Sequence, residues 1–157
     1  MAKVVRTFGA DYSFGKQKEI ESLPILNDYF KTTLTHNEHP MCPFDFENSL
    51  LAIEQKARHC SVNTYDETML QYTKIQNCSL PAYKDKERWF IFAFTDGVYG
   101  IRYDQQKFQK YTVLRSKIPD RVNIKEKEEL RIYIPITDLV FMSGGLDARQ
   151  RLYRFED

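Results

Sequence analysis

Asp45 and the triplet Glu54-Gln55-Lys56 bring together the side chains that metal-assisted phosphodiester hydrolysis needs. The spacing predicts one β-hairpin that carries both, with its turn at Asn48-Ser49 and its second strand at 50–58. Because side chains alternate between the two faces of a strand, Glu54 and Lys56 share a face while Gln55 points the other way. If Asp45 pairs near Glu54, two carboxylates and an ammonium group meet at one end of a small sheet.

The predicted chemistry follows from the preferences of a hard cation. Mg²⁺ binds oxygen in near-octahedral geometry and takes only one or two protein carboxylates, with water and phosphate oxygens completing its shell. Asp45 and Glu54 are therefore the expected ligands of Mg²⁺ or Mn²⁺, and the backbone carbonyl of Gln55 can add a third. The metal would lower the pKa of a bound water, and Lys56 would orient that water or help to deprotonate it.

An alternative interpretation is a charged hairpin whose acids and lysine only form cross-strand ion pairs on a solvated face. Residues 50–53 read Leu-Leu-Ala-Ile, which is continuously apolar up to Glu54. Such a run is typical of a strand that is covered on both faces, where charged side chains at its end are costly unless a partner of opposite charge compensates them. A bound metal ion would be such a partner for the carboxylates.

The first predicted helix runs from about Gly15 to Phe30, because Glu19, Leu23, Leu26 and Phe30 follow one another at helical spacing. Pro24 interrupts this pattern and can kink the helix. Glu19 lies on the apolar face, so we expect it to approach the same cation. The other reading is an acid that the helix dipole favours near the N-terminus.

The rest of the chain predicts an α/β fold: a central mixed sheet of four or five strands with helices on both faces. A capping box at Thr64–Glu67 starts a helix that runs to about Asn77. Asp96-Gly97 predicts a tight hairpin turn. The further expectations are a short helix capped by Asp104 and running through Tyr111, a solvated turn at Lys125–Glu129, an edge strand at 130–136 that Pro135 ends, and a mobile tail at 143–157.

The composition predicts one domain spanning residues 1–157, since 42% of the chain is hydrophobic and nothing divides it. No apolar run is long enough to span a bilayer, and the N-terminus lacks the apolar core of a secretory signal. We therefore expect an intracellular protein, cytoplasmic or nuclear, with no membrane partner. The three cysteines lack CxxC spacing and predict reduced thiols. His36, His39 and Cys42, with His59-Cys60 further on, raise the separate possibility of structural zinc.

The order of helix with Glu19, then Asp45, then Glu54-Gln55-Lys56, then a helix and further strands resembles the PD-(D/E)XK nuclease superfamily. The resemblance covers roughly residues 15–103 and is closest to Holliday-junction-resolvase-like members and small nuclease-like proteins of large DNA viruses. It implies a restriction-endonuclease-like fold and an endonuclease that cuts DNA. It also implies an active site of Glu19, Asp45, Glu54 and Lys56, with Glu19 as a further metal ligand.

Three further residues are candidates for binding phosphate. Arg58 lies two residues beyond Lys56 on the same strand face, and its guanidinium matches the fork of phosphate oxygens. Gln71 and Lys74 lie on the second predicted helix, where some superfamily members carry polar residues near the site. Small nucleases of this architecture commonly pair, so we expect a homodimer.

The chain departs from the family pattern in two ways. Pro43 is not directly before Asp45, and the bulky Gln55 fills the middle of the triplet. These departures leave an alternative function open, in which a catalytically inactive protein with the nuclease fold binds nucleic acid or a protein partner.

Overall fold

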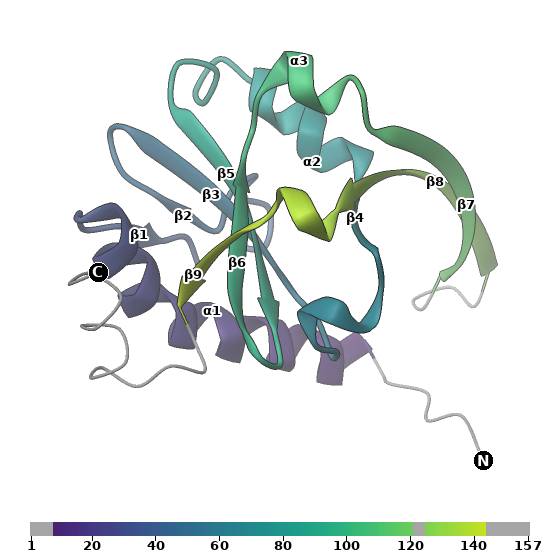
Figure 1. Ribbon diagram of the computed structural model, residues 1–157, viewed down its shortest axis with the longest axis horizontal. Helices are drawn as coiled ribbons and strands as arrows, with labels where there is room; N and C mark the ends of the chain where they lie inside the picture. Colours follow the sequence, from purple (N-terminus) through teal and green to yellow (C-terminus); the bar gives the residue numbers. More distant parts are fainter. Residues whose placement is uncertain (1–7, 121–124, 144–157) are drawn as a thin grey trace.

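The computed structural model describes residues 8–120 and 125–143. Within them, six strands form a mixed sheet in the order β1-β2-β3-β5-β6-β9, and three form an antiparallel sheet in the order β4-β8-β7 (Figure 1). Strands β3 and β5 run parallel, and all other neighbours are antiparallel. The strands are β1 (Thr35–His36), β2 (Phe46–Glu47), β3 (Leu51–Ala57), β4 (Glu67–Gln71), β5 (Glu87–Phe94), β6 (Gly97–Arg102), β7 (Thr112–Asp120), β8 (Lys125–Pro135) and β9 (Val140–Ser143).

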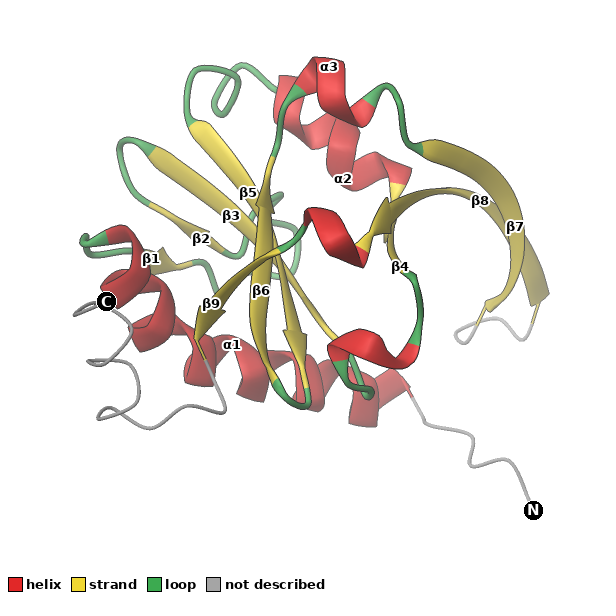
Figure 2. Cartoon of the chain, in the orientation of Figure 1, coloured by secondary structure: helices red, strands yellow, loops and turns green. Residues whose placement is uncertain are grey.

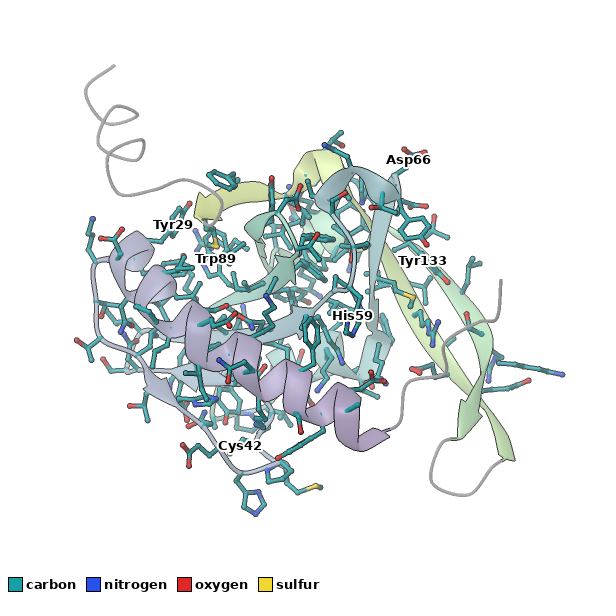
Figure 3. All side chains as sticks on the ribbon, turned by 90° about the horizontal axis from the view of Figure 1, so that it is seen from below. Tyr29, Cys42, His59, Asp66, Trp89 and Tyr133 are labelled. Atoms are coloured by element: carbon teal, nitrogen blue, oxygen red, sulfur yellow. The ribbon has the colours of Figure 1, made fainter. Side chains whose placement is uncertain are left out.

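The long helix α1 (Phe8–Phe30) covers one face of the six-stranded sheet (Figure 2). Leu26 is fully buried there, in a cluster with Ile53 of β3 and Ile91 of β5. At its C-terminal end Tyr29 lies beside Trp89 of β5, with ring centroids 6.3 Å apart (Figure 3). This apolar packing, rather than helix propensity alone, holds α1 against the sheet.

Helix α1 starts seven residues before the predicted start at Gly15 and continues through Pro24. The early turns contain Gly9 and Gly15, which weaken the local helix signal. Pro24 is exposed. The predicted helix was therefore right in type and too short at its N-terminus.

The opposite face of the six-stranded sheet packs against the second sheet and the short helices. These are α2 (Tyr72–Gln76) and α3 (Gln105–Phe108), with the 3-10 turns η1 (Val62–Thr64), η2 (Asn77–Ser79) and η3 (Ile136–Asp138). The larger apolar cluster fills this layer, where Phe90 and Phe92 of β5 pack with Ile132 and Ile134 of β8. Helices thus lie on both faces of the central sheet, as predicted.

Two predicted hairpins are confirmed. Strands β2 and β3 pair through Phe46↔Ile53 and Glu47↔Ala52. Strands β5 and β6 are joined at Asp96-Gly97, and the Asp96 carboxylate accepts a hydrogen bond from the backbone N–H of Val62 at 3.0 Å. Asp104 caps α3 by accepting a bond from the backbone N–H of Lys107 at 3.0 Å, although this helix ends at Phe108 rather than Tyr111.

The helix predicted from Thr64 to Asn77 is wrong over its first half. Residues Glu67–Gln71 form strand β4, which pairs with β8, and only Tyr72–Gln76 are α-helical. The buried positions Thr68 and Leu70 alternate with more exposed neighbours, which is the period of a strand. Pairing with the distant strand β8 outweighed the local capping-box signal.

The predictions for residues 125–136 also need correction. Strand β8 lies between β4 and β7, so it is not an edge strand, and its first residues are strand rather than a solvated turn. Pro135 is the last residue of β8, where a missing N–H costs little. The central sheet has six strands rather than the four or five predicted, and the second sheet was not foreseen. Residues 144–157 of the predicted mobile tail lie outside the described residues.

Residues 8–120 and 125–143 contain no helix both long enough and apolar enough to cross a membrane. The cysteines Cys42, Cys60 and Cys78 are free thiols, as predicted. Cys78 is fully buried in the larger apolar cluster, and burial raises the pKa of its thiol to about 12. It is therefore a packing residue rather than a reactive thiolate.

Candidate active site

The site begins at the open edge of β3, just beyond the last residue paired with β2. There the backbone N–H of Asp45 donates to the carbonyl of Ile53 at 2.9 Å. Its carboxylate Oδ2 accepts from the backbone N–H of Gln55 at 2.8 Å. The Asp45 side chain thus takes the place of a strand partner, and this local pairing holds its carboxylate beside the Glu54-Gln55-Lys56 triplet.

Glu54 lies on the face of the sheet that is turned away from α1, because it shares that face with Ala52 of the larger cluster. It is 5% exposed. Its Oε1 pairs with Nζ of Lys74 at 2.9 Å, while its buried Oε2 has no hydrogen-bond partner. Burial first, and then the negative charge of Asp45, raise the pKa of Glu54 to about 8.

Lys56 stands on the same face, two residues along the strand, and is half-buried. Burial, together with the positive charge of Lys74, lowers the pKa of Lys56, and the negative charge of Glu54 opposes this shift. A lysine whose pKa is lowered releases and accepts a proton more readily near neutral pH. The site therefore contains an amine suited to proton handling beside two carboxylates.

Glu19 reaches the same place from α1, on the other side of β3. Its carboxyl group hydrogen-bonds with that of Asp45, and burial followed by this bond and the charge of Asp45 raises the pKa of Glu19 to about 8. Lys16 lies 3.4 Å away and His36 Nε2 lies 3.7 Å away from Glu19 Oε2. The structure therefore brings Glu19, Asp45, Glu54 and Lys56 into one neighbourhood at the edge of β3.

Lys16 and His36 are members of this cluster that the sequence reasoning did not place there. Lys16 precedes Glu19 by three residues, a spacing that puts both on one helix face, so its signal was present. His36 had no such signal, because its position depends on the pairing of β1 with β2. Its ring stacks on Phe46, with centroids 5.2 Å apart.

Gln55 occupies the other face of β3, on the side of Ile53 and α1. Its side chain is 7% exposed, and neither its amide nitrogen nor its amide oxygen has a hydrogen-bond partner. A buried amide without hydrogen-bond partners costs free energy, so this side chain is a candidate to bind a water molecule or an ion. The observed role of its backbone is to donate to Asp45.

The three predicted phosphate ligands have different surroundings. Lys74 joins the site through Glu54. Arg58 is directed to β4, where Nε donates to Thr68 Oγ1 at 3.3 Å and Nη2 donates to the carbonyl of Met69. Gln71 ends β4, and its amide bonds Glu129 at 3.4 Å. Only Lys74 is thus in contact with the acidic cluster.

The residues considered for zinc are dispersed. His39 Nδ1 accepts a bond from the backbone N–H of Met41, and the ring of His59 stacks on Phe14 of α1 at 4.0 Å. Figure 3 shows His59 beside α1, while Cys42 belongs to the loop between β1 and β2. Among the described residues, no group of three or more His, Cys, Asp or Glu side chains is arranged to hold a metal ion.

The acidic cluster of Glu19, Asp45 and Glu54 is likewise not arranged as a group of three metal ligands. Asp45 neighbours Glu19 on one side and Glu54 on the other, so the three acids form two pairs that share Asp45 rather than one three-ligand site. No protein-family model matches this chain, and no match is found among the curated proteins. The function must therefore be inferred from the geometry of these pairs.

Proposed function

We propose that this protein is a divalent-metal-dependent endonuclease that hydrolyses phosphodiester bonds in DNA. The observation that carries this proposal is the meeting of Asp45, Glu54 and Lys56 at one edge of β3, with Glu19 adding a third acid from α1. Acidic side chains are rarely buried together unless something positive binds them. Here the two carboxyl groups beside Asp45 both have raised pKa values.

The donor set fits Mg²⁺ or Mn²⁺. Asp45 and Glu54 are oxygen ligands, and one buried oxygen of Glu54 lacks any hydrogen-bond partner. Mg²⁺ needs only one or two carboxylates from the protein, so the Asp45–Glu54 pair suffices without a third ligand. Glu19, hydrogen-bonded to Asp45, would support that pair from the α1 side. The backbone carbonyl of Gln55 is an additional candidate ligand.

When bound, the metal would activate a water and offset the charge that builds up on the phosphate. The residues of the chain have separate tasks. Asp45 and Glu54 hold the reacting centre at the strand edge, and Lys56 positions the attacking water and exchanges a proton with it. Lys74 and Lys56 both offer positive charge to a phosphate in a partly buried site, where charge interactions are stronger than in water.

The order of elements supports a restriction-endonuclease-like fold. Helix α1 is followed by the antiparallel strands β1, β2 and β3, and then by a crossover that contains β4 and the short helix α2 and leads to β5. A crossover is required here because β5 runs parallel to β3. Apart from the additional strand β4, this is the order of helix, hairpin, helix and further strand that the resemblance to the PD-(D/E)XK superfamily implies.

The Glu54–Lys74 ion pair favours the second candidate function, a catalytically inactive protein that keeps this fold and binds nucleic acid or a protein. The 2.9 Å contact already supplies Glu54 with a positive partner. In the active enzyme, Lys74 would have to share Glu54 with the metal.

Nicking of supercoiled plasmid in Mg²⁺ or Mn²⁺ tests the proposal. We expect Lys56→Ala and Asp45→Asn each to lower the rate about 100-fold or more, which is the usual contribution of a positioned proton-transfer group or ligand. Lys31→Asn is the matched control, because it removes an exposed charge at the far end of α1 and Asn tolerates the positive φ of 53° found there. Cutting that survives both site substitutions would overturn the proposal.

A further inference from the structure

A second polar site lies on the same face of the six-stranded sheet as Glu54 and Lys56. It is a hollow of about 520 Å³ between η2, the start of β5 and α3. Helix α3 lies at the top of Figure 1. Its lining includes Ser79, Lys84, Arg88, Tyr103, Asp104 and Gln105. This volume is in the range of small-ligand sites, but the walls carry hydroxyl, amide and cationic groups where an apolar ligand would need hydrocarbon.

Arg88 is held in one orientation at this hollow. Its Nη1 donates to the carbonyl of Cys78 at 2.5 Å, and its guanidinium lies over the ring of Tyr103, 5.1 Å from the centroid. Its Nε is buried and has no hydrogen-bond partner. A guanidinium that is fixed by two neighbours at the wall of a polar hollow is oriented to bind the oxygens of an anion.

The charges around the hollow favour an anion as well. Lys84 and Arg88 bring two positive charges, and Lys84 is exposed. Asp104 brings the one negative charge among the lining residues, and its Oδ1 is already occupied by the backbone N–H of Lys107. A phosphate group meets these requirements, since it is anionic and offers several acceptor oxygens.

The position of Arg88 relates the hollow to the acidic cluster. Arg88 pairs with Ala52 in the parallel register of β3 and β5, and Glu54 lies two residues further along the same face. Two strand residues span about 7 Å and the neighbouring strand lies about 4.8 Å to the side, so the two backbone positions are roughly 8 Å apart. This separation is only a few times the axial rise of about 3.4 Å per nucleotide in one strand of a duplex. One continuous strand can therefore contact both places.

We propose that Lys84 and Arg88 bind a backbone phosphate of the nucleic-acid strand whose scissile phosphate lies at Asp45 and Glu54. This inference rests on the proposed function and sets where the strand runs, across η2 and the start of β5. The aromatic ring of Tyr103 and the amide of Gln105 then lie beside the neighbouring nucleotide.

Binding of a fluorescein-labelled DNA duplex, measured by anisotropy in EDTA over a range of salt concentrations, tests this proposal without cleavage. We expect Lys84→Gln to weaken binding several-fold and to reduce the slope of log K against log salt by about 0.9, the value for one lost phosphate contact. Arg88→Lys keeps its charge but loses the planar fork, so we expect about 10-fold weaker binding with little change in slope. Lys31→Asn should match the wild type.

The outcomes separate this inference from the proposed catalysis. Wild-type affinity and slope in both Lys84→Gln and Arg88→Lys would overturn it, even if the protein cuts DNA, and so would a wild type that binds no duplex. Weakened binding in these variants, with a wild type that never nicks plasmid, would support the phosphate site and overturn the nuclease. Circular dichroism checks that Arg88→Lys is folded. If that variant unfolds, the DNA binding of Lys84→Gln, at an exposed position, tests the proposal by itself.

Discussion

Glu54 shows at the scale of one residue how burial and a like charge determine chemistry. Both effects raise its pKa to about 8 from an ordinary value of 4.5. In the metal-free protein the folded state therefore holds a proton that the unfolded state releases between about pH 4.5 and pH 8. The stabilisation is complete below the lower value and is lost as the pH rises through the upper one.

The expected result is a melting temperature in EDTA that falls between about pH 5 and pH 8 by more in the wild type than in Glu54→Gln, because the amide cannot ionise. Thermal unfolding followed by circular dichroism measures this difference. Glu38→Gln, at an exposed glutamate, should keep the wild-type profile. Parallel profiles for wild type and Glu54→Gln would show that Glu54 is ordinarily ionised in the folded protein.

At the scale of elements, Arg58 joins the end of β3 to β4. Its guanidinium donates to the side chain of Thr68 and to the backbone of Met69, and lies 5.7 Å from the ring centroid of Phe92. These contacts favour a structural role over the phosphate contact that the sequence suggested. They also fix the start of the second sheet against the strand that carries the site.

We expect Arg58→Lys to lower the free energy of unfolding by about 1–3 kcal/mol, because a buried, charged pair of hydrogen bonds is lost. Urea denaturation measures this change. Arg102→Lys is the control, since Arg102 is 64% exposed and its ion pair with Glu87 is a long surface contact of 3.9 Å, which contributes little. An unchanged stability together with weaker DNA binding at a nearly unchanged salt slope would return Arg58 to the role of phosphate ligand.

At the scale of the whole molecule, the described residues 8–120 and 125–143 hold one acidic cluster, and this limits what a monomer can do. Cutting both strands of a duplex needs two such clusters, so we propose that the protein acts as a symmetric homodimer. Light scattering after size exclusion, with and without DNA, should give the mass of two chains. A single-chain mass under both conditions, with nicking as the only activity, would contradict the dimer.

The sequence alone was sufficient for features that depend on neighbours along the chain. Turn chemistry and strand period account for the shared face of Glu54 and Lys56, the hairpin that brings Asp45 beside them, the Asp96-Gly97 turn and the cap at Asp104. These interactions join residues close in sequence, so their signals are local.

Only the tertiary structure decided the contacts made across long separations. The pairing of β4 with β8 turned a predicted helix into a strand, and the packing of α1 brought Glu19 and Lys16 to Asp45. The placement of α2 set Lys74 against Glu54. No local pattern encodes these contacts, because each depends on which distant apolar surface an element buries, and local propensity is weaker than that burial.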